Sequence, residues 1–175
     1  MGKARLLCTI NVIALLISPR LVRAQATPSI SLTIGTANAA VQLGKPVIIK
    51  VVTTSVSDHD VTYWRENSSD QGGYVYKIIV HNDAGVAPAD TELGKRFKEL
   101  DNPGHNSSDV PPEAPVNRSG GWFKLKPGES TTDYVDVSRL VYFNKAGTYT
   151  IRLQRFDEDR KLNVQSNAIN VTVGE

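Results

Sequence analysis

Gly147-Thr-Tyr-Thr-Ile-Arg-Leu-Gln-Arg-Phe156 is the stretch of sequence that most clearly predicts the fold. Its side chains alternate, because Tyr149, Ile151 and Leu153 fall on one face of an extended chain and polar residues fall on the other. This alternation is typical of a strand with one buried face and one solvated face. We expect the other strands of the chain to be arranged around this one.

The remaining sequence contains further short apolar runs, which are separated by turn-forming residues. Residues 47–54 are apolar on both faces, and this predicts a central strand. Seven to nine strands, close turns and no strong amphipathic helix are typical of a single all-β sandwich domain. The apolar runs cover residues 30–34, 39–41, 47–54, 61–64, 74–80, 122–125, 134–137, 140–143, 147–156 and 166–173.

Residues 86–121 interrupt this pattern. They show little periodicity, are rich in Pro, Asn, Ser and Asp, and contain one segment, residues 91–100, that could form a helical turn. Loops longer than about 15 residues are uncommon in compact domains and are usually functional or disordered. We therefore expect residues 86–121 to form a long loop insert and to be the first place to look for partner contacts.

Residues 1–24 are predicted to be a secretory signal peptide. They combine the basic start Met-Gly-Lys-Ala-Arg with a short apolar run and with small residues before a cleavage site after Ala24, with Ala26 as the alternative. The apolar run is too short to cross a bilayer, which takes about 20 residues. We expect a mature protein of residues 25–175 that is secreted or periplasmic, without stable membrane insertion.

Cleavage changes the charge and the cysteine content of the chain. It removes four of the 20 Lys and Arg residues and none of the 18 Asp and Glu residues, so the formal net charge of +2 becomes slightly negative. This near-neutral balance argues against a nucleic-acid partner. Cleavage also removes Cys8, the one cysteine of the sequence, so we expect no disulfide even in an oxidising compartment.

Three motifs resemble those of bacterial immunoglobulin-like modules. They are Ala146-Gly-Thr-Tyr-Thr-Ile151, Leu125-Lys-Pro-Gly-Glu-Ser130 and Ser166-Asn-Ala-Ile-Asn-Val-Thr-Val173. The first resembles the tyrosine corner that begins strand F of immunoglobulin-like sandwiches. The resemblance implies an immunoglobulin-like antiparallel β-sandwich and a structural role for Tyr149, whose hydroxyl would bond back to the chain upstream.

The order of features is also similar to the family of the bacterial intracellular proteinase inhibitor, which is an immunoglobulin-like sandwich. In that family a strand with a Ser-Asp turn, a Tyr-rich strand ending in Asp-x-Gly, a Pro-Gly-Glu-Ser turn and Gly-x-Tyr follow one another. Matching segments occur here at residues 47–58, 76–85, 125–130 and 147–151. These motifs are turns and corners, which report fold rather than activity, so no inhibitory residue is carried over.

Two polar clusters contain the residue types that bind metals. Asp58-His59-Asp60, with His81 and His105 elsewhere, offers nitrogen and oxygen ligands, and Asp157-Glu158-Asp159 offers the clustered oxygens that calcium takes. Both clusters fall between expected strands, where Asp and His commonly occur as solvated turn residues. We therefore predict charged turns, no metal site and no cofactor.

The aromatic residues are the stronger candidates for binding. An exposed row of rings on a β-sandwich can stack on sugars or anchor a protein partner. We favour core positions for Trp64 and Tyr76, because such sandwiches pack a tryptophan at their centre. The candidate contact residues are Trp122, Tyr63 and Tyr74. Trp122 either faces solvent or is covered by the insert.

The sequence contains no motif that predicts an enzyme. It has no Gly-x-Ser-x-Gly, no His-Glu-x-x-His, no phosphate-binding glycine loop and no cysteine nucleophile in the mature chain. We predict a secreted, non-catalytic immunoglobulin-like module for protein binding or structural scaffolding, with an unknown protein or glycan as partner. The alternatives are a proteinase-inhibitor-like domain and a carbohydrate-binding module, which would need Trp122 and either Tyr63 or Tyr74 exposed on one surface.

Overall fold

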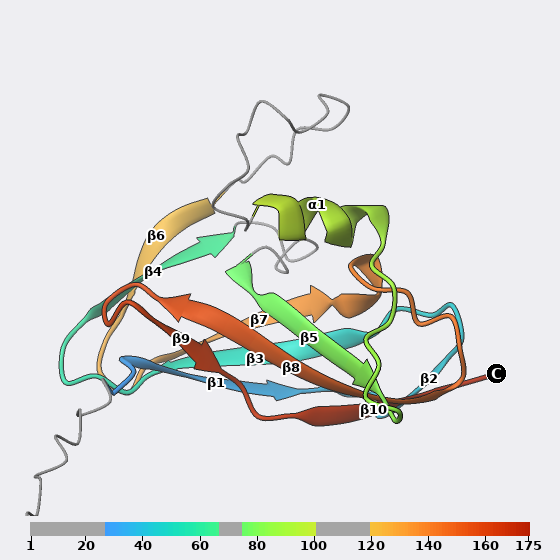
Figure 1. Ribbon diagram of the computed structural model, residues 1–175. Helices are drawn as coiled ribbons and strands as arrows, with labels where there is room; N and C mark the ends of the chain where they lie inside the picture. The colour runs from blue at the N-terminus through green and yellow to red at the C-terminus, as the bar shows by residue number, and fades with distance from the viewer. Residues whose placement is uncertain (1–26, 67–74, 101–119) are drawn as a thin grey trace, which may run out of the picture.

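The protein consists mainly of antiparallel strands, as a computed structural model of residues 27–66, 75–100 and 120–175 shows (Figure 1). The described part also has an α-helix, α1 (Glu92–Leu100), and a short 3₁₀ turn, η2 (Val137–Arg139). The strands are β1 (Ile30–Gly35), β2 (Ala40–Gln42), β3 (Ile48–Ser55), β4 (Val61–Glu66), β5 (Lys77–Asn82), β6 (Gly120–Leu125), β7 (Ser130–Asp136), β8 (Gly147–Asp157), β9 (Leu162–Gln165) and β10 (Ile169–Gly174).

The strands form two packed sheets and a ribbon. One sheet has the order β1-β3-β7, the other has the order β2-β10-β8-β5 with β9 paired to β8, and β4 and β6 form the two-stranded ribbon. β1 and β2 lie in different sheets, so the chain switches sheets near its start, and β2 then runs parallel to β10. This arrangement is that of an immunoglobulin-like β-sandwich, and the predicted fold class is confirmed.

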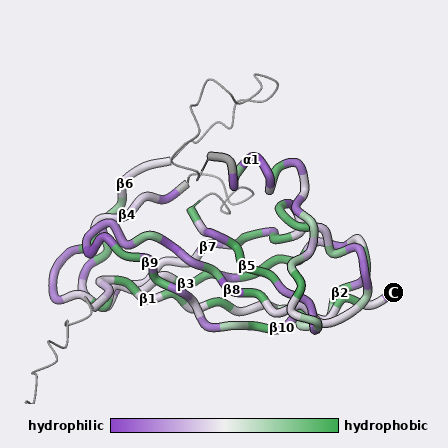
Figure 2. Tube along the Cα trace, viewed as in Figure 1, coloured by the Kyte–Doolittle hydropathy of each residue, from purple (hydrophilic) through white to green (hydrophobic). Residues whose placement is uncertain are grey.

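The core lies between the two sheets and is built from the alternation of the strands. Residues along the strands change between hydrophobic and hydrophilic, whereas α1 is mostly hydrophilic (Figure 2). Ile49 and Val51 of β3 belong to the same buried cluster as Ile151 and Leu153 of β8, and all four side chains are fully buried. β3 is the central strand of its sheet, as predicted from its two apolar faces.

The tyrosine corner is present at the start of β8. The hydroxyl of Tyr149 donates a hydrogen bond to the carbonyl oxygen of Lys145 at 2.8 Å, and the ring is buried. Phe143 packs edge to face on this ring, with 4.9 Å between the ring centroids. The structural role that the resemblance implies for Tyr149 is therefore confirmed.

Some element boundaries differ from the prediction. β9 was not predicted, because its four residues are too short a run to show alternation. Residues 140–143 form an apolar connection to the tyrosine corner, and within them Val141 makes an isolated bridge with Asp90. Residues 1–24, Tyr74 and residues 101–119 of the insert lie outside the described residues, so the signal peptide and most of the insert stay predictions.

The described beginning of the insert packs against the sandwich through α1. Thr91 caps this helix, because its hydroxyl accepts a hydrogen bond from the Gly94 N–H at 3.0 Å and donates one to the Arg139 carbonyl at 2.5 Å. A Cβ atom on Gly94 would lie 2.0 Å from the Leu140 carbonyl oxygen, so only glycine permits this contact. The helical segment expected at residues 91–100 is confirmed, and it is held on the turn that follows β7.

Candidate binding surface

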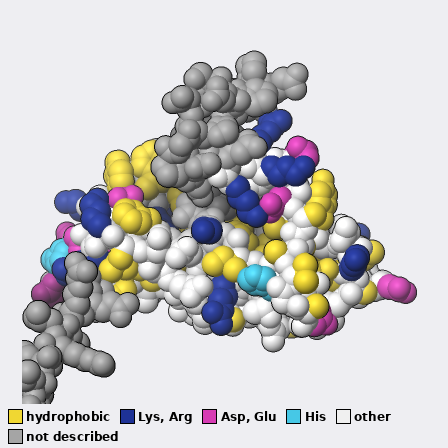
Figure 3. All heavy atoms as spheres, in the orientation of Figure 1, with side chains coloured by type: hydrophobic (Ala, Val, Ile, Leu, Met, Phe, Trp, Pro, Cys, Tyr) yellow, Lys and Arg dark blue, Asp and Glu magenta, His cyan; other side chains and the backbone are white. Residues whose placement is uncertain are grey.

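The β4–β6 ribbon rises from one end of the sandwich (Figure 1) and prolongs the pairing of β3 with β7. β3 leads into β4 and β6 leads into β7, with a turn on each side. Across the ribbon Tyr63 is paired with Phe123, and Trp64 is paired with Trp122. Because successive pairs point to opposite faces, the two aromatic pairs lie on opposite sides of the ribbon. Hydrophobic side chains gather at this end of the molecule (Figure 3).

The inner face of the ribbon closes the core. Val61, Tyr63 and Leu125 are buried, and Phe123 lies at the rim with its ring centroid 6.3 Å from that of Tyr63. Tyr63 is 5% exposed. The expectation that Tyr63 offers a contact surface to solvent is therefore wrong, because the pairing of β4 with β6 places its ring on the inner face of the ribbon.

The outer face of the ribbon carries two tryptophans in contact. Their rings meet edge to face, with 5.5 Å between centroids and an angle of 78°. Trp122 is 59% exposed, whereas Trp64 is half-buried. A Cβ atom on Gly120 would lie 2.7 Å from the Trp64 ring, so the glycine lets this ring lie across β6. Trp64 was expected in the core, and this prediction is wrong because Tyr63, its neighbour, takes the inward position.

A buried arginine fixes the ribbon to the sandwich. The Arg155 guanidinium lies 5.0 Å from the Tyr63 ring centroid and 5.3 Å from that of Tyr76, which gives it two cation–π contacts. Arg155 also donates hydrogen bonds to the Trp64 carbonyl and to the Tyr76 hydroxyl. Tyr76 is buried, as predicted. The sequence does contain a signal for the burial of Arg155. It lies two residues after Leu153 in the alternating pattern of β8, and therefore on the same inward face.

An aspartate completes this network from the other sheet. Asp133 of β7 accepts hydrogen bonds from the Tyr76 hydroxyl at 2.8 Å and from Nε of Arg65 at 2.9 Å. Burial raises the pKa of the Tyr76 phenol far above its ordinary value, so the hydroxyl keeps the proton that it donates. Strands β4, β7 and β8 and the residue that precedes β5 are thereby joined at one point. The ribbon is held at a defined angle to the sandwich by specific hydrogen bonds rather than by apolar contact alone.

The two polar clusters form charged turns near the base of the ribbon. The His59 imidazole lies 2.9 Å from the Asp58 carboxylate and 3.3 Å from that of Asp159. Both carboxylates favour the charged ring, and the hydrogen bond with Asp58 is the larger cause of the raised pKa of His59. Within the described residues no three His, Cys, Asp or Glu side chains are placed to hold a metal ion. His81 is exposed on β5, and His105 lies outside the described residues.

Asp157 belongs to the second cluster but points inward. Its carboxylate accepts hydrogen bonds from the N–H and the hydroxyl of Ser29, both at 2.7 Å, and from the N–H groups of Asp159 and Arg160. Burial opposes its ionisation, but these hydrogen bonds outweigh burial and lower its pKa. Its oxygens are therefore used to hold the β8–β9 turn against the start of β1.

Comparisons with known proteins give distant structural likenesses. No protein-family model and no curated protein matches the chain. A β-glucosidase from Listeria innocua in complex with glucose aligns with a TM-score of 0.42 at 11% identity, over 86% of this chain and 17% of that chain. The CARDB domain of a Pyrococcus furiosus protein in complex with di-metal ions aligns with a TM-score of 0.39 at 13% identity, over 83% of this chain and 88% of that chain. These likenesses are too distant to transfer a ligand or an activity.

Among the described residues no helix could span a membrane. α1 has nine residues and carries four charged side chains within Glu92–Lys98, so it is neither long enough nor apolar enough to cross a bilayer.

Proposed function

We propose that the protein is an exported, non-catalytic immunoglobulin-like module that binds a protein partner through the outer face of the β4–β6 ribbon. The observation that carries this proposal is the exposure of Trp122, of which 59% is open to solvent beside Trp64. Tryptophan is enriched among the residues that dominate binding energies in protein interfaces. Trp122 is the proposed anchor, and Trp64 is its support.

The setting of Trp122 favours a binding role over an accidental exposure. The edge-to-face contact with Trp64 and the Arg155 network limit the movement of the ring before a partner arrives. Less side-chain entropy is then lost on association, and this raises affinity for the same contact area. Lys124 lies two residues along the same face and is exposed, so the partner surface would be apolar at its centre and acidic or polar at its edge.

The burial of Tyr63 disfavours the carbohydrate-binding alternative. Sugar stacking in this region needs a second exposed ring beside Trp122, but Tyr63 is closed off and Phe123 lies on the other face of β6. Tyr74 lies outside the described residues. Catalysis is likewise not part of the proposal, because the buried ionisable side chains Arg155 and Asp157 and the partly buried Asp133 have structural partners.

Site-specific photocrosslinking tests the proposal in the cells that produce the protein. A photoreactive phenylalanine analogue is placed at Trp122 in one variant and at Tyr142 in the control variant, since Tyr142 is an exposed aromatic residue away from the ribbon. We expect a discrete protein adduct from position 122 and none of the same mass from position 142. Equal adducts at both positions, or none at 122, would contradict the proposal.

Export is tested separately by the mass of the protein recovered outside the cytoplasm. We expect a chain that begins at Gln25, or at Thr27 if cleavage follows Ala26. A recovered chain that retains residues 1–24 would contradict the signal-peptide part of the proposal, but it would leave the binding part intact.

A further inference from the structure

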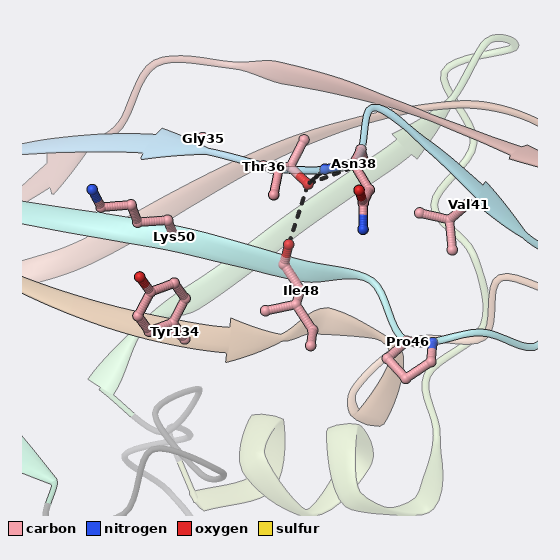
Figure 4. Close-up of a pocket in the computed structure, with 9 residues that line it drawn as sticks. Gly35, Thr36, Asn38, Val41, Pro46, Ile48, Lys50 and Tyr134 are labelled. Atoms are coloured by element: carbon pink, nitrogen blue, oxygen red, sulfur yellow. Dashed lines mark hydrogen bonds between the residues drawn. The ribbon is translucent and has the colours of Figure 1, made fainter.

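A second surface lies at the opposite end of the β3–β7 pair from the ribbon. A groove of about 500 Å³ is formed there by the end of β1, the turn before β2, the start of β3 and the middle of β7 (Figure 4). Its lining includes Asn38 of the turn, Ile48 and Lys50 of β3, and Tyr134 of β7. This surface shares no residue with the ribbon.

The groove is open because a glycine ends β1. In the sheet Lys50 is paired with Gly35 on one side and with Tyr134 on the other. A Cβ atom at Gly35 would find no atom within 4 Å, so the sheet has an empty place beside Lys50. Ile48 and Tyr134 are 51% and 53% exposed, which is high for large apolar residues on a sheet.

The two ends of the groove differ in chemistry. Lys50 and Tyr134 stand together at one end, Pro46 and Val41 stand at the other, and Ile48 lies between them (Figure 4). Among the described residues the Lys50 ammonium has no hydrogen-bond or ion-pair partner. A ligand that matches this groove carries a negative charge at one end and an aliphatic group at the other.

Asn38 adds a polar group above the apolar part. The Thr36 hydroxyl accepts a hydrogen bond from the Asn38 N–H at 3.2 Å and also lies 3.2 Å from the Ile48 carbonyl oxygen, to which it can donate, so the turn is anchored on β3. The Asn38 side chain extends from this turn into the groove (Figure 4). An amide side chain offers both a donor and an acceptor, which is the set that a peptide group can pair with.

We propose that this groove binds the C-terminal end of an extended peptide whose last residue is aliphatic. The terminal carboxylate pairs with the Lys50 ammonium and the Tyr134 hydroxyl, and the last side chain covers Ile48 towards Pro46. The Asn38 amide pairs with the preceding peptide group. A simple aliphatic acid would make no contact with the Asn38 amide, and a sugar would place its hydroxyl groups on aliphatic side chains.

The test uses the acetylated peptide Ser-Gly-Ala-Leu with a free C-terminal carboxylate and the same peptide as its C-terminal amide. Binding is followed by the NMR shifts of the Gly35 and Lys50 backbone amides in the full-length mature protein. We expect saturable shifts with the free acid and an affinity at least about threefold lower with the amide, as an exposed ion pair provides. Equal affinities, or no saturable shift, would overturn the proposal.

Substitutions test the contribution of each part of the groove separately. Lys50→Met should reduce the difference between acid and amide, because only the Tyr134 hydroxyl is left to pair with the carboxylate, whereas the control Lys77→Met, an exposed lysine on β5, should retain it in full. Ile48→Ser should weaken both peptides. Unchanged amide shifts at Ile151 and Val171 in the core check that each variant is folded. A Lys50→Met protein that prefers the acid as strongly as the wild type would overturn the assignment of the carboxylate end.

A third ligand distinguishes a peptide from a small acid. 4-Methylpentanoate has the carboxylate and the branched end but no peptide group, so it should bind more weakly than the free peptide, and Asn38→Ala should reduce that difference. If 4-methylpentanoate binds as tightly as the peptide, the site is one for small aliphatic acids and the peptide assignment fails. Photocrosslinking at Trp122 is unaffected by either result, so failure here leaves the function proposed for the ribbon standing.

Discussion

The two halves of β8 are equally buried but chemically opposite. On the inward face, Tyr149, Ile151 and Leu153 are followed in the same phase by Arg155 and Asp157. The exposed fractions of these five side chains lie between 0% and 5%. The pleat of the strand sets the direction of each side chain whatever its polarity. What differs between the halves is how burial is made favourable.

The first half is stabilised by the removal of apolar surface from water, and any apolar neighbour of suitable shape contributes. The second half requires particular partners, because a buried charge without hydrogen bonds is strongly unfavourable. Arg155 finds two rings and two oxygens, and Asp157 finds Ser29 and two backbone N–H groups of its own turn. The ribbon end of the sandwich is therefore the part whose geometry depends on a few specific contacts.

Leu153→Ala should have the largest effect among changes on this strand. Leu153 is fully buried, and the substitution leaves a cavity between the sheets. We expect a loss of about 3 kcal/mol in the free energy of unfolding, measured by urea denaturation. The control Arg152→Ala, on the exposed face of β8, should change it by less than about 0.5 kcal/mol. Similar losses for both variants would mean that the apolar half does not depend on close packing.

Arg155→Met should have a smaller but more local effect. Methionine keeps most of the aliphatic volume but loses the cation–π contacts and leaves the Trp64 carbonyl without its donor. We expect a loss of about 2 kcal/mol in the free energy of unfolding. Amide hydrogen exchange should increase over that of the wild type more in β4 than in β10. The matched control is Arg152→Met. A gain in stability would show that the cost of burying the cation exceeds the value of its contacts, as happens for some buried charges.

The sequence predicts one half of β8 better than the other for a physical reason. Apolar alternation is a local signal, so the inward direction of Tyr149, Ile151 and Leu153 can be read from neighbouring residues. Arg155 bonds to Tyr76 across 79 residues, and Asp157 bonds to Ser29 across 128. No local pattern specifies such partners. The same limit explains the errors at Tyr63 and Trp64, whose directions depend on pairing with β6.

The two candidate binding surfaces also differ in whether a local sequence pattern predicts them. Trp122 was identified from the sequence as a contact residue, because it stands opposite the apolar face of its own strand. The groove at Lys50 was not anticipated, since Gly35, Asn38 and Tyr134 come together only when β1 and β7 flank β3. A glycine at the end of a strand indicates little by itself. Its meaning appears only when the register places it beside a lysine.

Asp157→Asn should change how the stability of the protein depends on pH under acidic conditions. The pKa of Asp157 is lowered in the folded protein, so its contribution is fully present above the unfolded value of about 3.9 and is lost as the pH falls through the folded value. We expect the urea concentration at the unfolding midpoint of the wild type to decrease as the pH is lowered below about 4. For Asp157→Asn this decrease should be less steep. Glu158→Gln controls for the loss of one negative charge, because Glu158 does not bond to Ser29. Equal slopes for Asp157→Asn and the wild type would contradict this assignment.

His59 should show the smallest effect, because it is exposed and its partners are on the surface. Its pKa is raised, first by the hydrogen bond with Asp58 and then by that with Asp159, so its stabilising contribution is present below about pH 6.5 and is lost as the pH rises through the folded pKa. An NMR titration of the imidazole should show that Asp159→Asn lowers the pKa of His59, whereas Asp60→Asn leaves it nearly unchanged. A lowered value would mean that the β3–β4 turn is tied to the end of β8 in solution, which adds a third attachment of the ribbon to those made by Arg155 and Asp133. If Asp159→Asn has no effect, the position of the ribbon depends on the buried network alone, and Arg155→Met becomes the decisive test of what orients Trp122.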